Sequence, residues 1–127
     1  MWEGLTALLI FCVYICIRKV KGEVNTMEGI ELTCFQIISS VGGARSCFVE
    51  AIQLAKKRDF EGAEKLIKEG EALFTEGHKA HAKLVQQEAS GEKVDVVLLL
   101  VHAEDQLMSA EAFKILANEF IDVYKQM

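Results

Sequence analysis

The chain has 127 residues, of which 51% are hydrophobic and 26% charged, and this apolar content is enough to bury a core and excludes a mainly disordered chain. Its 14 basic and 19 acidic side chains give a net charge of −5, whereas nucleic-acid-binding modules usually carry a basic excess, so we expect no nucleic-acid partner. The chain contains no proline and few aromatic residues, which favours long helices over a small β-sandwich or barrel.

Residues 1–26 are an apolar N-terminal extension, which we separate from a domain spanning residues 27–127. Residues 4–17 carry no charge, and basic side chains follow within residues 18–21. The uncharged run is shorter than the ~20 residues that span a bilayer, and a secretory signal would have its basic residues before the apolar run. Two interpretations stay open: a short membrane anchor, or a start assigned upstream of a true start at Met27.

The cysteines lie in the first half of the chain, and no pair has the spacing of a zinc or redox motif. We therefore expect free, buried thiols in a reducing compartment. The four residues are Cys12, Cys16, Cys34 and Cys47.

The first predicted helix covers about residues 29–57, where apolar residues recur at intervals of three and four, as in an amphipathic helix. Gly42 and Gly43 interrupt this pattern. Each glycine costs about 1 kcal/mol relative to alanine in a helix interior. The pair therefore predicts either a kink or a place where another backbone comes close.

The second predicted helix covers about residues 60–89, with Asp59 suited to its N-cap. Its charged residues fall largely outside the apolar stripe and predict a solvated face. His78 and His81 lie three residues apart, but the usual helical zinc pattern, H-E-x-x-H, is absent. Metal binding by this pair is therefore the weaker interpretation.

The third predicted helix runs from Glu92 to the end of the chain. Its first part, residues 94–101, is a continuous apolar run that could equally be a buried strand, because periodicity does not separate the two. A helix that is apolar on every side must be covered on every side, and two neighbouring helices cannot do this. The excess apolar surface predicts self-association.

Two polar residues in this third stretch carry the candidate chemistry. His102 and Asp105 lie three residues apart and share a helix face. Asp105 falls within an apolar series, where a carboxylate is costly unless it is paired, otherwise satisfied by hydrogen bonds, or bound to a metal. The neutral imidazole of His102 is a nucleophile that can carry a phosphoryl group. The chain shows no P-loop, nucleophile elbow or Rossmann glycine set for binding a nucleotide.

Residues 100–109, Leu-Val-His-Ala-Glu-Asp-Gln-Leu-Met-Ser, resemble the lactose/cellobiose class of the enzyme IIA component of the bacterial phosphotransferase system. Residues 88–92 match the same family, and residues 42–46 and 59–63 match it more weakly. The resemblance covers residues 27–127. It implies an all-α fold, an antiparallel up-down-up three-helix bundle that assembles as a homotrimer.

The resemblance also implies a function. His102 would accept a phosphoryl group from the histidine-containing phosphocarrier protein and pass it to a cysteine of the cognate IIB protein, which serves a membrane IIC permease. The sugar would be a β-glucoside such as cellobiose or diacetylchitobiose, or lactose, and the protein would be cytoplasmic. Asp105 would lie near the trimer axis, where three carboxylates meet and a divalent cation, Mg²⁺, would bind.

Two further residues are candidates for hydrogen-bond donors to the phosphoryl group: Gln106, one turn after His102, and His81 from the second helix. The family often has His at the position of Gln106, and Gln at the positions of Glu104 and His81. A role that needs a second imidazole beside His102 is therefore open. The alternative function is a helical scaffold or regulatory interaction protein that kept the fold without phosphotransfer.

Overall fold

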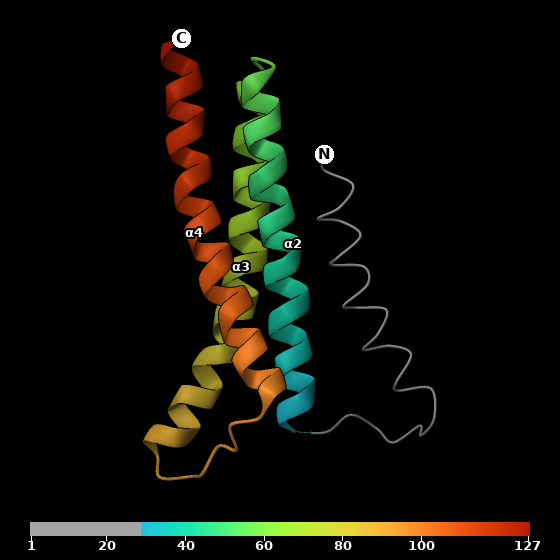
Figure 1. Ribbon diagram of the computed structural model, residues 1–127, viewed down its shortest axis with the longest axis vertical. Helices are drawn as coiled ribbons and strands as arrows, with labels where there is room; N and C mark the ends of the chain where they lie inside the picture. Colours follow the sequence, from blue (N-terminus) through green and yellow to red (C-terminus); the bar gives the residue numbers. More distant parts are fainter. Residues whose placement is uncertain (1–28) are drawn as a thin grey trace, which may run out of the picture.

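The computed structural model describes residues 29–127, in which three long helices pack together (Figure 1). They are α2 (Ile30–Lys56), α3 (Phe60–Ala89) and α4 (Leu98–Gln126). Helices α2 and α4 run in one direction and α3 runs back between them in sequence, which is the up-down-up order (Figure 1). The predicted all-α three-helix bundle is confirmed, and the extension at residues 1–26 lies outside the described residues.

Helix α2 continues without interruption through Gly42 and Gly43. At Gly43 the reason is close packing, because an added Cβ would lie 3.1 Å from Leu73 Cδ1 of α3. An added Cβ at Gly42 would meet nothing within 4 Å. The pair therefore produces neither the predicted kink nor the close approach of another backbone: the neighbour of Gly43 is a side chain, and Gly42 has open space beside it.

Glycines of α3 allow α2 and α3 to pack closely. A Cβ added at Gly70 would lie 2.5 Å from Phe48 Cε1, and one added at Gly77 would lie 2.6 Å from Val41 Cγ1. Phe48 is 0% exposed, so its ring has no room to move away. The two large side chains of α2 therefore occupy the space that a side chain on α3 would need.

The core has two parts along the bundle, and small residues contribute many of its buried positions. The part near the start of α4 contains Cys34, Ile37, Val41, Ala80, Leu100, Ala103, Leu107 and Ala110. The part near the end of α4 contains Ala44, Phe48, Ala51, Ala55, Ala63, Ile67, Ala117 and Ile121. Because alanine lets helix backbones come close, the third helix is held tightly along most of its length.

The turn between α2 and α3 joins the two helices to the end of α4. Arg58 adopts φ 68°, and the next backbone N–H, that of Asp59, donates to Leu54 O at 3.0 Å, as in a Schellman motif. The Arg58 guanidinium donates to Tyr124 O of α4 at 2.6 Å. The Asp59 carboxylate accepts from Gly62 N at 2.9 Å, which confirms the predicted N-cap of α3.

Helix α4 begins at Leu98, so the predicted start at Glu92 is wrong. Residues 92–97 have no helical or strand structure, and Val97 has extended backbone angles of φ −103° and ψ 160°. The strand interpretation of residues 94–101 is also wrong, because the second half of this run forms the first turn of α4. No strand occurs anywhere in the described chain, so an isolated one would have no hydrogen-bonding partner.

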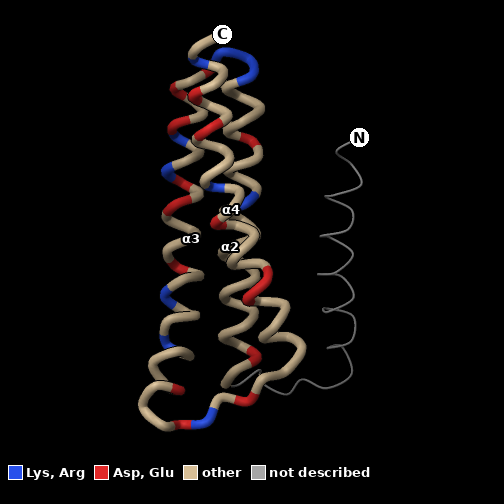
Figure 2. Tube along the Cα trace, turned by 60° about the vertical axis from the view of Figure 1, so that its left-hand side comes forward, with Lys and Arg blue, Asp and Glu red and all other residues tan. Residues whose placement is uncertain are grey.

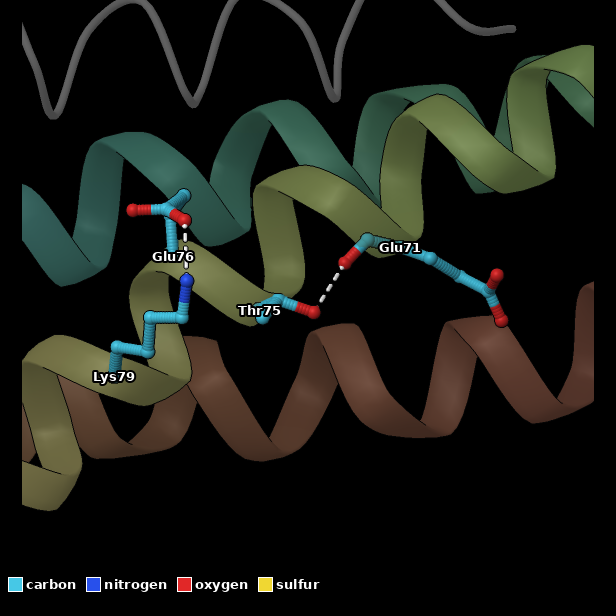
Figure 3. Close-up of polar contacts among 4 residues, drawn as sticks. All are labelled: Glu71, Thr75, Glu76 and Lys79. Atoms are coloured by element: carbon cyan, nitrogen blue, oxygen red, sulfur yellow. Dashed lines mark hydrogen bonds and ion pairs between the residues drawn. The ribbon is translucent and has the colours of Figure 1, made fainter.

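The outer face of α3 is polar, as predicted. Lys, Arg, Asp and Glu follow α3 along its whole length (Figure 2). Lys79 Nζ pairs with Glu76 Oε1 at 3.0 Å, and the Thr75 hydroxyl donates to Glu71 O at 2.8 Å (Figure 3). These two contacts lie within α3 itself, whereas Glu71 and Glu64 pair with Lys114 and Lys125 of α4 at the edge of this face.

One helix in the described part of the chain, α2, is long and apolar enough to cross a membrane by length and composition, with a mean hydropathy of 1.2. A core helix passes the same test. The buried side of α2 packs against both other helices and supplies residues to both parts of the core. The bundle therefore accounts for part of the apolar composition of α2, since 28% of its most apolar stretch is buried.

The packing at Gly70 generates a stability prediction. Gly70→Ala should lower the free energy of unfolding. Overpacking against the immobile Phe48 ring destabilises the fold by about 1–3 kcal/mol, whereas the higher helix propensity of alanine stabilises it by only up to about 1 kcal/mol. Thermal and urea unfolding of the full chain measure the change. Gly42→Ala is the matched control and should be neutral or stabilising, because its Cβ meets nothing. Equal effects at the two positions would contradict the packing.

Candidate functional site

The first half of α4 presents three different sides to its surroundings. Successive helical residues are about 100° apart, so the buried Leu100, Ala103 and Leu107 mark the side that faces the core. The residues between them fall on an exposed side and on two flanks, one toward α2 and one toward α3. His102, Gln106 and Asp105 each lie on one of these three surfaces, and His81 of α3 contacts one of them.

His102 is exposed on the flank toward α2. Gln106 and Ser109 follow it at four and seven residues, so the three share this flank. The guanidinium of Arg45, on α2, donates from Nη1 to Ser109 Oγ at 3.4 Å, and this contact places the flank beside α2. The structure therefore puts Gln106 one turn from His102, as the sequence predicted. Sequence reasoning assigned no role to the contact between Arg45 and Ser109.

His81 contacts the opposite flank. Its Nε2 lies 3.1 Å from Oε1 of Glu104, and the two side chains are 24% and 37% exposed. Glu104 follows His102 by two residues, so the two side chains point to nearly opposite sides of α4. Within one chain, His81 therefore meets Glu104 and not His102. The sequence showed that both residues depart from the family pattern, but it did not indicate that they pair.

His78 lies beside this pair on α3. Its ring stacks on Phe74 at a centroid distance of 6.1 Å and lies 6.0 Å from the ring of His81. Among residues 29–127, no group of three or more His, Cys, Asp or Glu residues could hold a metal ion. The geometry therefore gives no support to a zinc site at the two histidines.

Asp105 is exposed and lies on the third side of α4, amid apolar neighbours. Met108 and Ile115 on the same side are 61% and 59% exposed. The described ion pairs do not include Asp105: they join Lys79 with Glu76, His81 with Glu104, Lys93 with Asp95, Lys114 with Glu71, and Lys125 with Glu64. We call this surface the α4 stripe. It consists of Leu98, Val101, Asp105, Met108, Ala112, Ile115, Leu116, Phe120 and Val123.

The two cysteines of the described residues are free, as predicted, but only Cys34 is buried and Cys47 is partly exposed. Burial raises the pKa of the Cys34 thiol, and the charges of Glu104 and Glu31 raise it further. Burial likewise raises the pKa of the Cys47 thiol, with added effects of Glu69 and Glu50. Both thiols therefore stay protonated near neutral pH and are poor nucleophiles. Cys12 and Cys16 lie outside the described residues.

This arrangement suits transfer between proteins better than chemistry in an enclosed pocket. An exposed imidazole on a rigid helix lets a second macromolecule reach its nitrogen. A phosphoryl group needs mainly a positioned nucleophile and groups that offset its charge. Gln106 lies one turn from His102 and can supply a hydrogen-bond donor, whereas the cation of Arg45 reaches the same flank two turns away, at Ser109.

A family model described as the lactose/cellobiose-specific IIA subunit of the PTS system matches residues 32–125. The lichenan-specific phosphotransferase enzyme IIA component of Bacillus subtilis (strain 168) is 40% identical over 100 residues, which cover 79% of this chain and 91% of the relative.

Two solved structures share the fold. The cellobiose-specific enzyme IIA from Bacillus anthracis has a TM-score of 0.75 and 40% identity, over 80% of this chain and 94% of that chain. The IIA(chitobiose) protein, solved in solution as its complex with HPr, has a TM-score of 0.70 and 29% identity, over 79% of this chain and 97% of that chain.

The contact between His81 and Glu104 can be tested by a double-mutant cycle. His81→Gln and Glu104→Gln, alone and together, should give a coupling energy of about 0.2–1 kcal/mol, because a partly exposed pair is worth little more. Urea unfolding at low and high salt, at a pH acidic enough to protonate histidine, measures it, because the contact is an ion pair only when His81 is charged. The coupling should then fall as salt screens the charges. The more exposed pair of Lys79 and Glu76 is the control and should couple more weakly. A cycle that closes with zero coupling contradicts the pairing.

Proposed function

The chain belongs to the lactose/cellobiose-specific IIA subunit family of the bacterial phosphotransferase system, and from this we propose that it carries a phosphoryl group on His102. Family membership makes the protein a phosphotransferase component. The observation that carries the assignment to His102 is its exposure on the flank of α4, within the segment that resembles the family most closely. Within one chain, His102 is exposed, and this exposure is what a second protein needs to reach it.

The phosphoryl group arrives from a phosphohistidine of the histidine-containing phosphocarrier protein. A nitrogen of His102 attacks the phosphorus, a new N–P bond forms, and the N–P bond of the carrier breaks. A cysteine thiolate of the cognate IIB protein then attacks the phosphorus, so that an S–P bond forms, the N–P bond on His102 breaks and the electron pair returns to the imidazole. The phosphoryl group serves a sugar that enters through the IIC permease. The solved complex of a IIA(chitobiose) relative with HPr supports the first step.

The assembly is a homotrimer around the α4 stripe. The stripe exposes large apolar side chains along α4, and a monomeric soluble protein rarely leaves such a surface uncovered. Three parallel copies of α4 around a threefold axis bury it. In such a heterologous interface, one flank of each helix meets the opposite flank of the next.

This assembly brings His81 back toward the phosphoryl site. The flank that bears Glu104 and His81 in one subunit faces the flank that bears His102 in the next. Gln106 of the same chain and His81 of the neighbouring chain are then the hydrogen-bond donors close to the phosphoryl group. Both are neutral or cationic donors and can offset its charge.

Asp105 lies at the centre of the α4 stripe, so three copies meet at the axis. A single chain places one carboxylate there, which is too few ligands for a metal ion. The Asp105 carboxylates form a metal site only when three subunits combine. Carboxylate oxygens suit a hard divalent cation, and Mg²⁺ bound there would offset the repulsion of three like charges.

The sugar is a β-glucoside such as cellobiose or diacetylchitobiose, with lactose as the remaining option. The lichenan- and cellobiose-specific relatives, each at 40% identity, support the first choice. The protein acts in the cytoplasm, where phosphoenolpyruvate and the phosphocarrier protein supply the phosphoryl group.

The phosphoryl-carrier role has a direct test. The full chain is incubated with phosphoenolpyruvate, enzyme I and the phosphocarrier protein, and phosphate is located by mass spectrometry under conditions that preserve phosphohistidine. We expect an acid-labile phosphate on His102, and none after His102→Gln. His78→Gln, a change of another exposed histidine, is the control and should leave the label on His102.

A label that persists in His102→Gln would move the acceptor to another residue. A folded wild-type protein that takes no label at all would reject the carrier role. The helical scaffold or regulatory interaction protein would then be the better function.

The role of Asp105 has a separate test. Asp105→Leu should leave the trimer intact and stabilise it by about 1–4 kcal/mol or leave it unchanged, because apolar side chains replace like charges at the axis. Sedimentation measures the assembly and thermal unfolding the stability. Glu50→Leu, an exposed carboxylate on α2 away from the α4 stripe, is the matched control. A trimer that dissociates only on Asp105→Leu would show that the metal is required for assembly.

A further inference from the structure

Gly42 destabilises α2, and no packing contact within the chain offsets this loss of stability. Glycine inside a helix is unfavourable relative to alanine. At Gly43, Gly70 and Gly77 an added Cβ would crowd Leu73, Phe48 and Val41, but at Gly42 it would meet nothing within 4 Å. No contact within the described chain therefore accounts for a glycine at this position.

The place of Gly42 follows from the contact between Arg45 and Ser109. Helices α2 and α4 pack against each other and run in the same direction (Figure 1). Because Arg45 meets Ser109, the residues three positions earlier on each helix, Gly42 and Gln106, come to nearly the same level. His102 lies one turn further along the same flank of α4.

We call this line of contact the α2–α4 seam: Gly42 and Arg45 on α2, with His102, Gln106 and Ser109 on α4. Its middle lacks a side chain on α2. One end has the exposed imidazole of His102, and the other has the guanidinium of Arg45, which is only partly buried. The seam therefore combines a nucleophile, a cation and clearance between them.

We propose that the α2–α4 seam is the surface on which the phosphorylated carrier protein lands, with Gly42 retained to leave room for the phosphohistidine segment and Arg45 attracting its charge. The proposal rests on His102 being the acceptor. For the N–P bond of the carrier to break as the N–P bond on His102 forms, the donor imidazole must approach in line within a few ångströms. A side chain at position 42 would project toward that path.

The Arg45 cation explains why an anionic partner is favoured at this place. The chain as a whole carries a net charge of −5, so a phosphoryl dianion is repelled at long range. A local cation beside the landing surface offsets this repulsion and guides the approach. Arg45 and Gly42 are thus positioning residues, since neither is required to touch the reacting atoms.

The experiment measures KM for the phosphorylated carrier and kcat for labelling of His102 in the full chain. Gly42→Leu should raise KM roughly tenfold to a hundredfold, the effect expected from overpacking an interface, with kcat at saturating carrier changed much less. The melting temperature should stay equal or rise, because leucine is a better helix former. Gln36→Leu, at an exposed position on another face of α2, is the matched control and should leave KM unchanged.

Arg45→Gln provides the second arm. It should raise KM at low salt and reduce the salt dependence of KM, since the charge that salt screens has been removed. The Arg45→Gln variant should still be labelled on His102 when the carrier is saturating. This outcome separates the present proposal from the phosphoryl-carrier role, because that role fails only if the wild-type protein takes no label.

Three outcomes would overturn the proposal. An unchanged KM in a folded Gly42→Leu variant would show that the carrier lands elsewhere. A loss of the trimer in that variant, seen by sedimentation, would assign Gly42 to contacts between subunits. An equal rise in KM for Gln36→Leu would show that the effect is not specific to the seam.

Discussion

Two helices cannot surround a third, and this constraint determines which parts of α4 remain available for function. Small residues in α2 and α3 bring the helices close together, and the buried side of α4 packs into both parts of the core. Everything else on α4 stays at the surface. His102 lies on one flank, Glu104 on the other, and Asp105 on the side between them. The separation of these roles is a consequence of the helical period and of where the neighbouring helices lie.

A phosphoryl carrier needs an acceptor that is fixed and yet accessible to two different proteins. The packing of α4 provides the first requirement, because the turn of helix that bears His102 also bears Leu100 and Ala103, which are in the core. The exposure of the flank provides the second. A deep pocket would satisfy neither partner, since each must bring its own phosphorylated side chain into line with the same nitrogen.

The positions of a few charged residues around α4 matter more for its surroundings than the total charge of the chain. Asp105, on the exposed α4 stripe, is unfavourable in an interface unless copies of the chain or a cation compensate it. The pair of His81 and Glu104 links α3 to α4 on the flank opposite His102. Arg45 links α2 to α4 on the flank of His102 itself. The two contacts thus hold α4 from opposite flanks, and each one involves a neighbour that is remote in sequence.

The sequence by itself determined the helical class, the approximate extent of α2 and α3, the N-cap at Asp59, and the spacing that puts His102 and Gln106 on one face. These follow from local periodicity and capping chemistry, which depend only on residues a few positions apart. It misplaced the start of α4, because a run of valines and leucines has no period that separates extended chain from helix.

Only the tertiary structure decided which glycine of the pair is needed for packing, that His81 meets Glu104, and that Arg45 meets Ser109. These contacts depend on how far each helix is rotated and shifted against its neighbour. Rotation and shift are set by the sum of many small packing contacts across the core, and no short stretch of sequence contains that information.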